Sequence, residues 1–150
     1  MSAALHIAPV ELRLNLGCSD SHRKGFLNVD LCAPADIVAD LTQPWPWATS
    51  SVSEIAAWDI FEHLPSKLHT MNEAHRVLAH GGFFFSSTPS TDGRGAFCDP
   101  THVSFWNELS FRYYTNAQYQ AYIQRQATCR FQSLRVRTYM PDSFCAANNI

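Results

Sequence analysis

Apolar residues in the first 61 positions fall into short runs separated by polar and glycine-containing turns. The runs have the length of strands: LRLNL at 12–16, FLNV at 26–29, DIVADL at 36–41 and SEIAAWDIF at 53–61. Short apolar runs bounded by turn signals are typical of buried strands. The pattern therefore predicts four strands in this part of the chain.

The period of the apolar positions changes between residues 66 and 79. Apolar side chains recur there at steps of three and four residues, which gives one face of a helix. Ser66 supplies a start signal, and Gly81-Gly82 predicts where the helix stops. A further strand, FFFSST, is expected at 83–88 and is closed by Pro89.

The C-terminal third is less clearly patterned. Residues 90–104 are expected to form a long loop, a kind of segment that is often functional. Residues 107–125 are aromatic and predicted to be helical, and FQSLRVRTY at 131–139 alternates as a half-buried strand does. Strands interspersed with a helix predict an α/β fold with a largely parallel sheet. Ligands of such sheets bind beyond the carboxyl ends of the strands.

Composition is typical of one globular domain over residues 1–150, with 46% hydrophobic and 16% charged residues. No apolar run approaches the ~20 residues of a membrane span, so no membrane partner is expected. The opening residues, MSAALHIAPVELR, lack the basic start and the apolar stretch of a signal peptide.

The five cysteines are scattered and odd in number, and no C-x-x-C occurs. This usage argues against a disulfide framework or a zinc ribbon and favours a reducing compartment, so we expect a cytoplasmic protein. His69, His75 and His80 are six and five residues apart, not the four that places two ligands on one helix face. No metal site is therefore expected.

The net charge of −2 is unevenly distributed. Residues 1–101 carry six Lys/Arg and eleven Asp/Glu, whereas residues 102–150 carry five and two. A basic, aromatic C-terminal third could face an anionic partner, although a solvated surface explains the same charges. No nucleic-acid-binding motif is recognised, so nucleic acid is not expected as a partner.

Three positions after predicted strands have chemistry suited to a nucleoside. Gly17 lets the backbone turn sharply and approach a ligand without a Cβ in the way. Asp30, thirteen residues later, can accept hydrogen bonds from both hydroxyls of a ribose. Asp40 could accept from an adenine amino group, with Leu41 as an apolar wall. Each position alone could equally be a turn or a cap, but their order favours a ligand site.

These residues lie in a series of blocks that resembles the class I S-adenosylmethionine-dependent methyltransferases, and among them the small bacterial branch called methyltransferase type 11. The blocks are LNLGCSD, GFLNVDL, ADIVADL, WPW, SSVSEIAAWDIFEHLP, MNEAHRVLAHGGFFFSSTP and GRGAFCDPTHVSFWNELSFRYY. They follow one another over about residues 12–115. The resemblance implies a Rossmann-like fold with S-adenosylmethionine as cofactor, a cofactor half at about 12–89 and an acceptor-side part at about 90–150.

The resemblance also implies roles for residues at the strand ends. The turn at 17–19 would lie under the methionine part of the cofactor, and Asp30 would hold the ribose hydroxyls. Asp40 and Leu41 would flank the adenine, and Trp58 and Asp59 would line the methyl-transfer face. The implied cofactor-binding residues are Asn15, Gly17, Cys18, Ser19, Asp30, Leu31, Asp40, Leu41, Trp58 and Asp59.

Three features depart from the family pattern. Asn15 stands where the family usually has an acid, and Ser19 stands where it usually has a second glycine. Only eight residues separate Gly17 from Phe26, so the usual helix after the first strand is expected to be shortened or absent. One of the basic side chains at 22–24 would then meet the cofactor's carboxylate. The chain also ends early, so the C-terminal strand region could be incomplete.

An oxygen acceptor often needs a base, and the candidate catalytic residues are Asp59, His63 and His102. Alternatives remain for two of them. His63 could be a structural residue, and Asp99 and His102 could pin the loop through mutual hydrogen bonds. The aromatic residues between 105 and 114 could wall an acceptor site or belong to the core.

The sequence as a whole favours S-adenosylmethionine-dependent methyl transfer to an unidentified small-molecule or sugar-linked acceptor. A methyltransferase-like binding module without activity is the alternative, because the glycine turn is altered and the chain ends early. A nicotinamide-dependent oxidoreductase is disfavoured, since G-x-G-x-x-G is missing and the acid follows thirteen rather than about twenty residues later. An incomplete sheet edge leaves a homodimer open.

Overall fold

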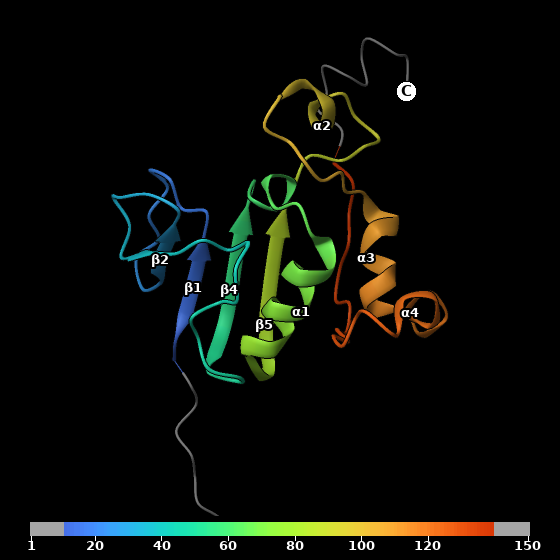
Figure 1. Cartoon of the computed structure of the whole chain (residues 1–150), viewed down its shortest axis with the longest axis horizontal. Helices are drawn as coiled ribbons and strands as arrows, with labels where there is room; N and C mark the ends of the chain where they lie inside the picture. The colour runs from blue at the N-terminus through green and yellow to red at the C-terminus, as the bar shows by residue number, and fades with distance from the viewer. Residues whose placement is uncertain (1–10, 140–150) are drawn as a thin grey trace, which may run out of the picture.

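Five strands form one sheet in the computed structural model of the chain, which describes residues 11–139 (Figure 1). The order across the sheet is β3-β2-β1-β4-β5, and each neighbouring pair is parallel. The α/β class and the largely parallel sheet predicted from the sequence are therefore confirmed. The strands are β1 (Arg13–Leu16), β2 (Leu27–Asp30), β3 (Ile37–Val38), β4 (Val52–Trp58) and β5 (Leu78–Ser87).

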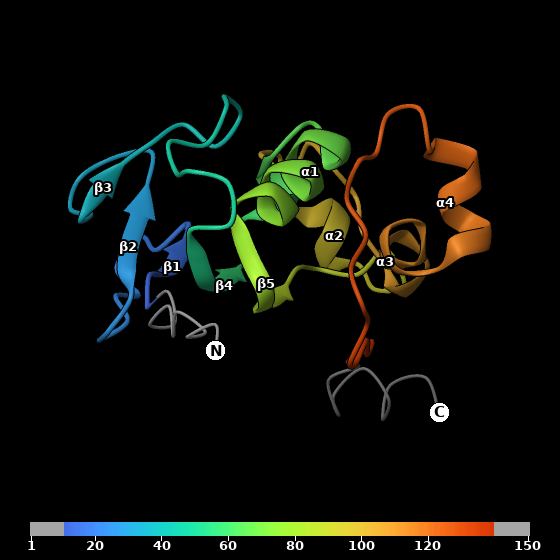
Figure 2. The same cartoon turned by 90° about the horizontal axis from the view of Figure 1, so that it is seen from below.

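The helices lie on one face of the sheet and beyond its β5 edge (Figure 1 and Figure 2). α1 runs in front of β5, α3 and α4 lie past β5, and the single turn α2 stands near the carboxyl ends of the strands. No helix within residues 11–139 has the length and apolar character needed to span a membrane. The helical elements are η1 (Phe61–His63), α1 (Lys67–Val77), α2 (Gly95–Cys98), α3 (Glu108–Thr115) and α4 (Ala117–Ile123).

Each of the longer helices begins at a polar cap. The Ser66 side chain accepts from the backbone N–H of His69, as the sequence predicts for the start of α1. Asn107 and Ser110 form a reciprocal capping box at α3. Asn116 ends α3 and caps α4, so the helical segment predicted at 107–125 is confirmed as two short helices. Such caps satisfy backbone N–H groups that have no partner within the helix.

The buried face of the sheet packs against α1. Leu14, Ile55 and Phe84 stand opposite one another on β1, β4 and β5, so their side chains point to the same face. Leu14 and Ile55 are fully buried, and α1 meets this face with Met71 and Val77. The burial of these apolar side chains is the main term that stabilises the sheet against the helix.

Phe61 links the sheet to the C-terminal part of the chain. Its buried ring lies 5.6 Å from the ring of Phe84 and 5.6 Å from that of Trp106. Its backbone carbonyl accepts from the Ser104 hydroxyl at 2.8 Å and from Trp106 Nε1 at 3.3 Å. The segment after β4 and the loop before α3 are therefore held together by one aromatic cluster.

The prediction that Gly81-Gly82 stops the first long helix was wrong. α1 ends at Val77, and the next residue, Leu78, is already extended and begins β5. The register between β4 and β5 then shifts, and Gly81 has a φ of 79°. The glycines therefore mark an irregularity inside β5, because a helix needs no glycine stop when the next residue pairs directly into a strand.

The strand predicted at 131–139 was also wrong, because this segment has no regular secondary structure. Phe131 is anchored at its start, with its ring 5.6 Å from Phe84 and 5.2 Å from His75. A segment with alternating apolar and polar residues forms a strand only where a neighbouring strand is available to pair with its backbone. In contrast, the segment 17–26 contains no helix, which confirms the expected loss of the helix after the first strand.

The substitution Phe61→Ala should lower the free energy of unfolding by about 3–5 kcal/mol, because it leaves a cavity between two aromatic rings. Phe83→Ala removes the same atoms from a side chain that is 51% exposed, and it should cost no more than about 1 kcal/mol. Urea denaturation of the two variants measures the difference. Equal losses would show that Phe61 is not a core residue.

Candidate functional site

The turns after the strands meet at one edge of the sheet, because parallel strands all end on the same side. Leu16 pairs with Val29 on one side and with Ala57 on the other, close to the last residue of each strand. The turn at 17–19, Asp30 at the end of β2 and Asp59 after β4 therefore lie along the same edge. This is the edge at which the sequence predicts a nucleoside site.

The turn after β1 is pressed against the segment that follows β4. Gly17 has a φ of 65°, and a Cβ at this position would lie 2.7 Å from Cβ of Ile60. A side chain there would therefore clash and force an unfavourable backbone conformation. Cys18 is buried, and its pKa is raised by burial and by the charge of Asp30, which does not suit a nucleophile.

Asp30 is tied to this turn by hydrogen bonds. Its Oδ2 accepts from the backbone N–H of Ser19 at 2.8 Å, and its Oδ1 accepts from that of Leu31 at 2.7 Å. Ser19 has a positive φ of 41°, and the Leu31 side chain is 64% exposed. Oδ1 also accepts from the backbone N–H of Cys32 at the long distance of 3.4 Å. A ligand hydroxyl can therefore use the remaining lone pair of Oδ2, and a second one can displace this weak contact at Oδ1.

Asn15, predicted as a cofactor residue, is committed to holding the loop at 17–26. Its buried side-chain amide donates to the Ser21 carbonyl at 2.9 Å and to Oδ1 of Asn28 at 3.0 Å. The same Oδ1 accepts from the backbone N–H of Arg23 at 2.7 Å. Two asparagines on β1 and β2 therefore hold the loop that replaces the usual helix.

Asp40 and Leu41 follow β3 but differ in exposure. Asp40 is exposed, and hydrogen bonds from the hydroxyl and the backbone N–H of Thr42 lower the pKa of its carboxyl group. Leu41 is buried in the core, and its carbonyl accepts from Nε1 of Trp45 at 3.1 Å. The sequence predicts that the Leu41 side chain forms an apolar wall beside the adenine. In the structure this side chain packs into the hydrophobic core instead.

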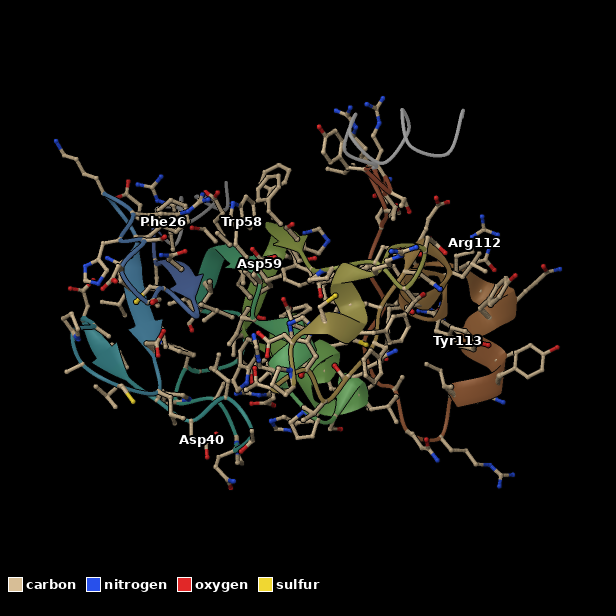
Figure 3. The ribbon with its side chains drawn as sticks, turned by 90° about the horizontal axis from the view of Figure 1, so that it is seen from above. Phe26, Asp40, Trp58, Asp59, Arg112 and Tyr113 are labelled. Atoms are coloured by element: carbon tan, nitrogen blue, oxygen red, sulfur yellow. The ribbon has the colours of Figure 1, made fainter. Side chains whose placement is uncertain are left out.

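Trp58 and Asp59 stand at the end of β4. Figure 3 places Trp58 beside Phe26, and Asp40 on the other side of the sheet, the side of α1. The Arg23 guanidinium lies 4.4 Å from the Trp58 ring, a cation–π distance that joins the 17–26 loop to β4. Asp59 is exposed with a φ of 49°, a conformation that non-glycine residues rarely adopt.

His63 and His102 are brought together with a residue that the sequence did not single out as catalytic. His102 Nε2 lies 4.0 Å from Oε1 of Glu62, and the rings of the two histidines are 5.0 Å apart. The Glu62 side chain is buried, and its Oε2 accepts from the Thr88 hydroxyl at 3.0 Å. Glu62 begins the short sequence EHL at 62–64. Only the fold shows that its side chain faces His102, 40 positions later.

From the sequence, Asp99 and His102 could pin their loop through mutual hydrogen bonds. In the structure this loop is held by other contacts. His102 Nε2 is 3.9 Å from Asp99 Oδ2, too long for a hydrogen bond. Asp99 instead accepts from the Thr101 backbone N–H and hydroxyl, which lowers the pKa of the Asp99 carboxyl. His102 Nδ1 lies 2.9 Å from the Ala96 carbonyl oxygen.

The aromatic residues between 105 and 114 divide between core and surface. Trp106 and Tyr114 are buried, whereas Phe105 and Tyr113 are 40% and 37% exposed. Tyr113 also lines a cleft of about 450 Å³ between the start of α1 and the helices α3 and α4. This cleft contains none of the predicted cofactor-binding or catalytic residues. Its lining consists of Pro65, Ser66, Lys67, Leu68, Ser110, Tyr113, Tyr114 and Ile123.

Comparison with known proteins gives a structural match but no match in sequence. No family model matches the chain, and no curated protein matches it. A chain in a Haloferax volcanii structure, described as "Complex between the Haloferax volcanii Trm112 methyltransferase activator and the putative methyltransferase", superposes with a TM-score of 0.54 at 16% identity. The match covers 71% of this chain and 60% of the solved one, so the chain spans less than two thirds of that protein's length.

At 16% identity the likeness concerns the fold. It agrees with the parallel sheet described above and is consistent with a methyltransferase fold. It does not identify a branch of methyltransferases, an acceptor or a binding residue. What this edge can bind depends on its own side chains.

The substitution Asn15→Leu should loosen the 17–26 loop, because it removes two buried hydrogen bonds and leaves their acceptors without that donor. We expect a loss of about 1–3 kcal/mol in unfolding free energy and faster amide hydrogen exchange in this loop. Asn72→Leu is the matched control, since Asn72 bonds instead to residues 126 and 128. If amide hydrogen exchange in the 17–26 loop is unchanged in Asn15→Leu, the Asn15 side chain does not hold this loop.

Proposed function

We propose that this chain binds S-adenosylmethionine at the carboxyl edge of its sheet and transfers the methyl group to a small-molecule or sugar-linked acceptor. The observation that carries the proposal is the link between the Gly17 turn and Asp30. The turn has no room for a Cβ at Gly17, and Ser19 holds the Asp30 carboxylate at the same edge. A tight glycine turn at the carboxyl edge of the sheet and a carboxylate suited to a ribose thus lie together.

The other strand-end residues can be assigned to parts of the same ligand. Asp40, exposed after β3, is suited to accept from an adenine amino group. Arg23 and Trp58 are in cation–π contact and connect the 17–26 loop to the end of β4. They are suited to the methionine end of the cofactor. The bound cofactor supplies the reactive methyl group, and the chain supplies alignment and electrostatics.

Three side chains near the end of β4 are candidates to take a proton from an acceptor hydroxyl. Asp59 is the exposed one, and His63 on η1 and His102 on the loop before α3 have their rings close to one another. A base within hydrogen-bond reach of the acceptor typically contributes 10²–10⁴-fold to the rate. Acceptors that are already nucleophilic, such as a carboxylate or a free amine, need no such base.

Calorimetric titration with S-adenosylmethionine and S-adenosylhomocysteine tests the cofactor site. Asp30→Asn should weaken binding by about 10–150-fold, because it removes hydrogen bonds to a charged acceptor worth about 1.5–3 kcal/mol. Glu108→Gln is the matched control, since Glu108 is an exposed acid on α3 paired with Arg112. It should bind like the unaltered chain. No binding by the unaltered chain, or equal binding by both variants, would contradict the proposed site.

Product formation separates catalysis from binding alone. The chain is incubated with S-adenosylmethionine and small hydroxyl, carboxylate and amine acceptors, and S-adenosylhomocysteine is measured. With a hydroxyl acceptor, Asp59→Asn should slow turnover by about 10²–10⁴-fold, and asparagine tolerates the positive φ at this position. Cofactor binding without turnover on any acceptor would instead select a methyltransferase-like binding module.

A further inference from the structure

Three ligand-bearing side chains from two distant segments converge above the end of β4. Glu62 and His63 belong to η1, and His102 belongs to the loop between α2 and α3. One oxygen or nitrogen atom from each lies within 4.8 Å of the others. The set contains two imidazoles and one carboxylate, and no residue spacing in the sequence indicates it.

The hydrogen bond of His102 determines which of its ring nitrogens is free. Nδ1 lies 2.9 Å from the Ala96 carbonyl oxygen, which can only accept, so Nδ1 carries the hydrogen. In the neutral ring Nε2 then has a lone pair, and it faces Oε1 of Glu62 at 4.0 Å and Oδ2 of Asp99 at 3.9 Å. A lone pair that faces two carboxylates favours a positive charge between them.

The hydrogen bond of His63 indicates the same tautomer. Its Nδ1 lies 3.2 Å from the Thr101 carbonyl oxygen, so this nitrogen is also the donor and Nε2 is left free. The Thr101 hydroxyl donates to Asp99 and holds the loop in place. An imidazole whose second N–H donates to a backbone carbonyl is the usual arrangement of a histidine that binds a metal.

Burial adds an electrostatic reason. The side chains of Glu62 and His102 are only 3% and 7% exposed. Within residues 11–139, His102 is the ionisable group recorded within 4.0 Å of the Glu62 carboxylate, at a distance too long for a hydrogen bond. Buried carboxylates are normally paired with a close positive charge or bound to a metal.

We propose that Glu62, His63 and His102 bind a divalent transition-metal ion, with Zn²⁺ as the expected occupant. Imidazole nitrogen is a preferred ligand of Zn²⁺ and its neighbours in the series, whereas Mg²⁺ and Ca²⁺ prefer oxygen ligands throughout. A tetrahedral ion with ligands at about 2.0–2.2 Å holds them roughly 3.4 Å apart. Side-chain shifts of about 1 Å therefore close the site.

Three protein ligands leave one coordination position open, as in catalytic rather than structural zinc sites. An oxygen at that position would have a lowered pKa. This use of the site rests on the proposed methyl transfer, and it would leave Asp59 as the proton acceptor. The metal site itself does not depend on the cofactor, so it can be tested without S-adenosylmethionine.

The test is metal titration of the chelator-treated full chain. Calorimetry with Zn²⁺ should give one specific site, and Co²⁺ should give a visible absorption band typical of low coordination number. Because Cys32 and Cys98 are exposed thiols, the near-ultraviolet region of the Co²⁺ spectrum is recorded to detect thiolate ligands. Binding at the proposed site gives no thiolate absorption.

Variants assign the site. His102→Ala and Glu62→Gln should each weaken Zn²⁺ binding by at least about 100-fold, more than the 10–100-fold typical of a residue that only orients a ligand. His80→Ala is the matched control, because His80 is exposed on β5 at the end opposite the site. It should bind like the unaltered chain, and circular dichroism confirms that each variant is folded.

Other outcomes overturn the proposal. These are thiolate absorption in the Co²⁺ complex, equal affinity in His102→Ala and His80→Ala, or no binding at millimolar Zn²⁺. The last result would leave the packing of the His102 loop against η1 as the explanation of the cluster. Loss of metal binding would leave the calorimetric result with S-adenosylhomocysteine unaffected, so the two proposals fail separately.

Discussion

The parallel pairing of β1 with β4 is the constraint on which the candidate site depends. It places Leu16 opposite Ala57, so the turn after β1 and the turn after β4 leave the sheet side by side. Gly17 then lies against Ile60 with no room for a side chain. Because β2 pairs with the other side of β1, Asp30 comes within hydrogen-bond distance of the same turn. The apolar face of these strands therefore sets the geometry of their polar ends.

The second half of the chain is attached to this edge through η1. Phe61 anchors the aromatic cluster beneath it, while the next two residues, Glu62 and His63, face the loop that carries His102. The backbone of that loop is also held here, since Val103 and Ser104 both donate to the Glu62 carbonyl. The short helix η1 therefore joins the sheet to the C-terminal part of the chain. It also provides two of the three ionisable groups of the cluster, Glu62 and His63.

The sequence predicts local and periodic features well and fails where a feature depends on distant partners. The strands and the helix start at Ser66 follow from apolar runs and caps, and the missing helix follows from eight residues between Gly17 and Phe26. The predicted end of α1 was wrong because Leu78 pairs with Val52 of β4. No local signal in the sequence indicates this pairing. The inward packing of Leu41 and the meeting of Glu62 with His102 likewise depend on how segments far apart in the chain fold together.

The central claim is that the Gly17 turn and Asp30 form one side of a nucleoside site. A crystal structure of the chain with S-adenosylhomocysteine tests it most directly. Both ribose hydroxyls should lie within about 2.6–3.2 Å of the Asp30 carboxylate, with the rest of the ligand along the Gly17 turn. A ligand bound elsewhere, for example in the cleft between α1 and α3, would contradict the claim.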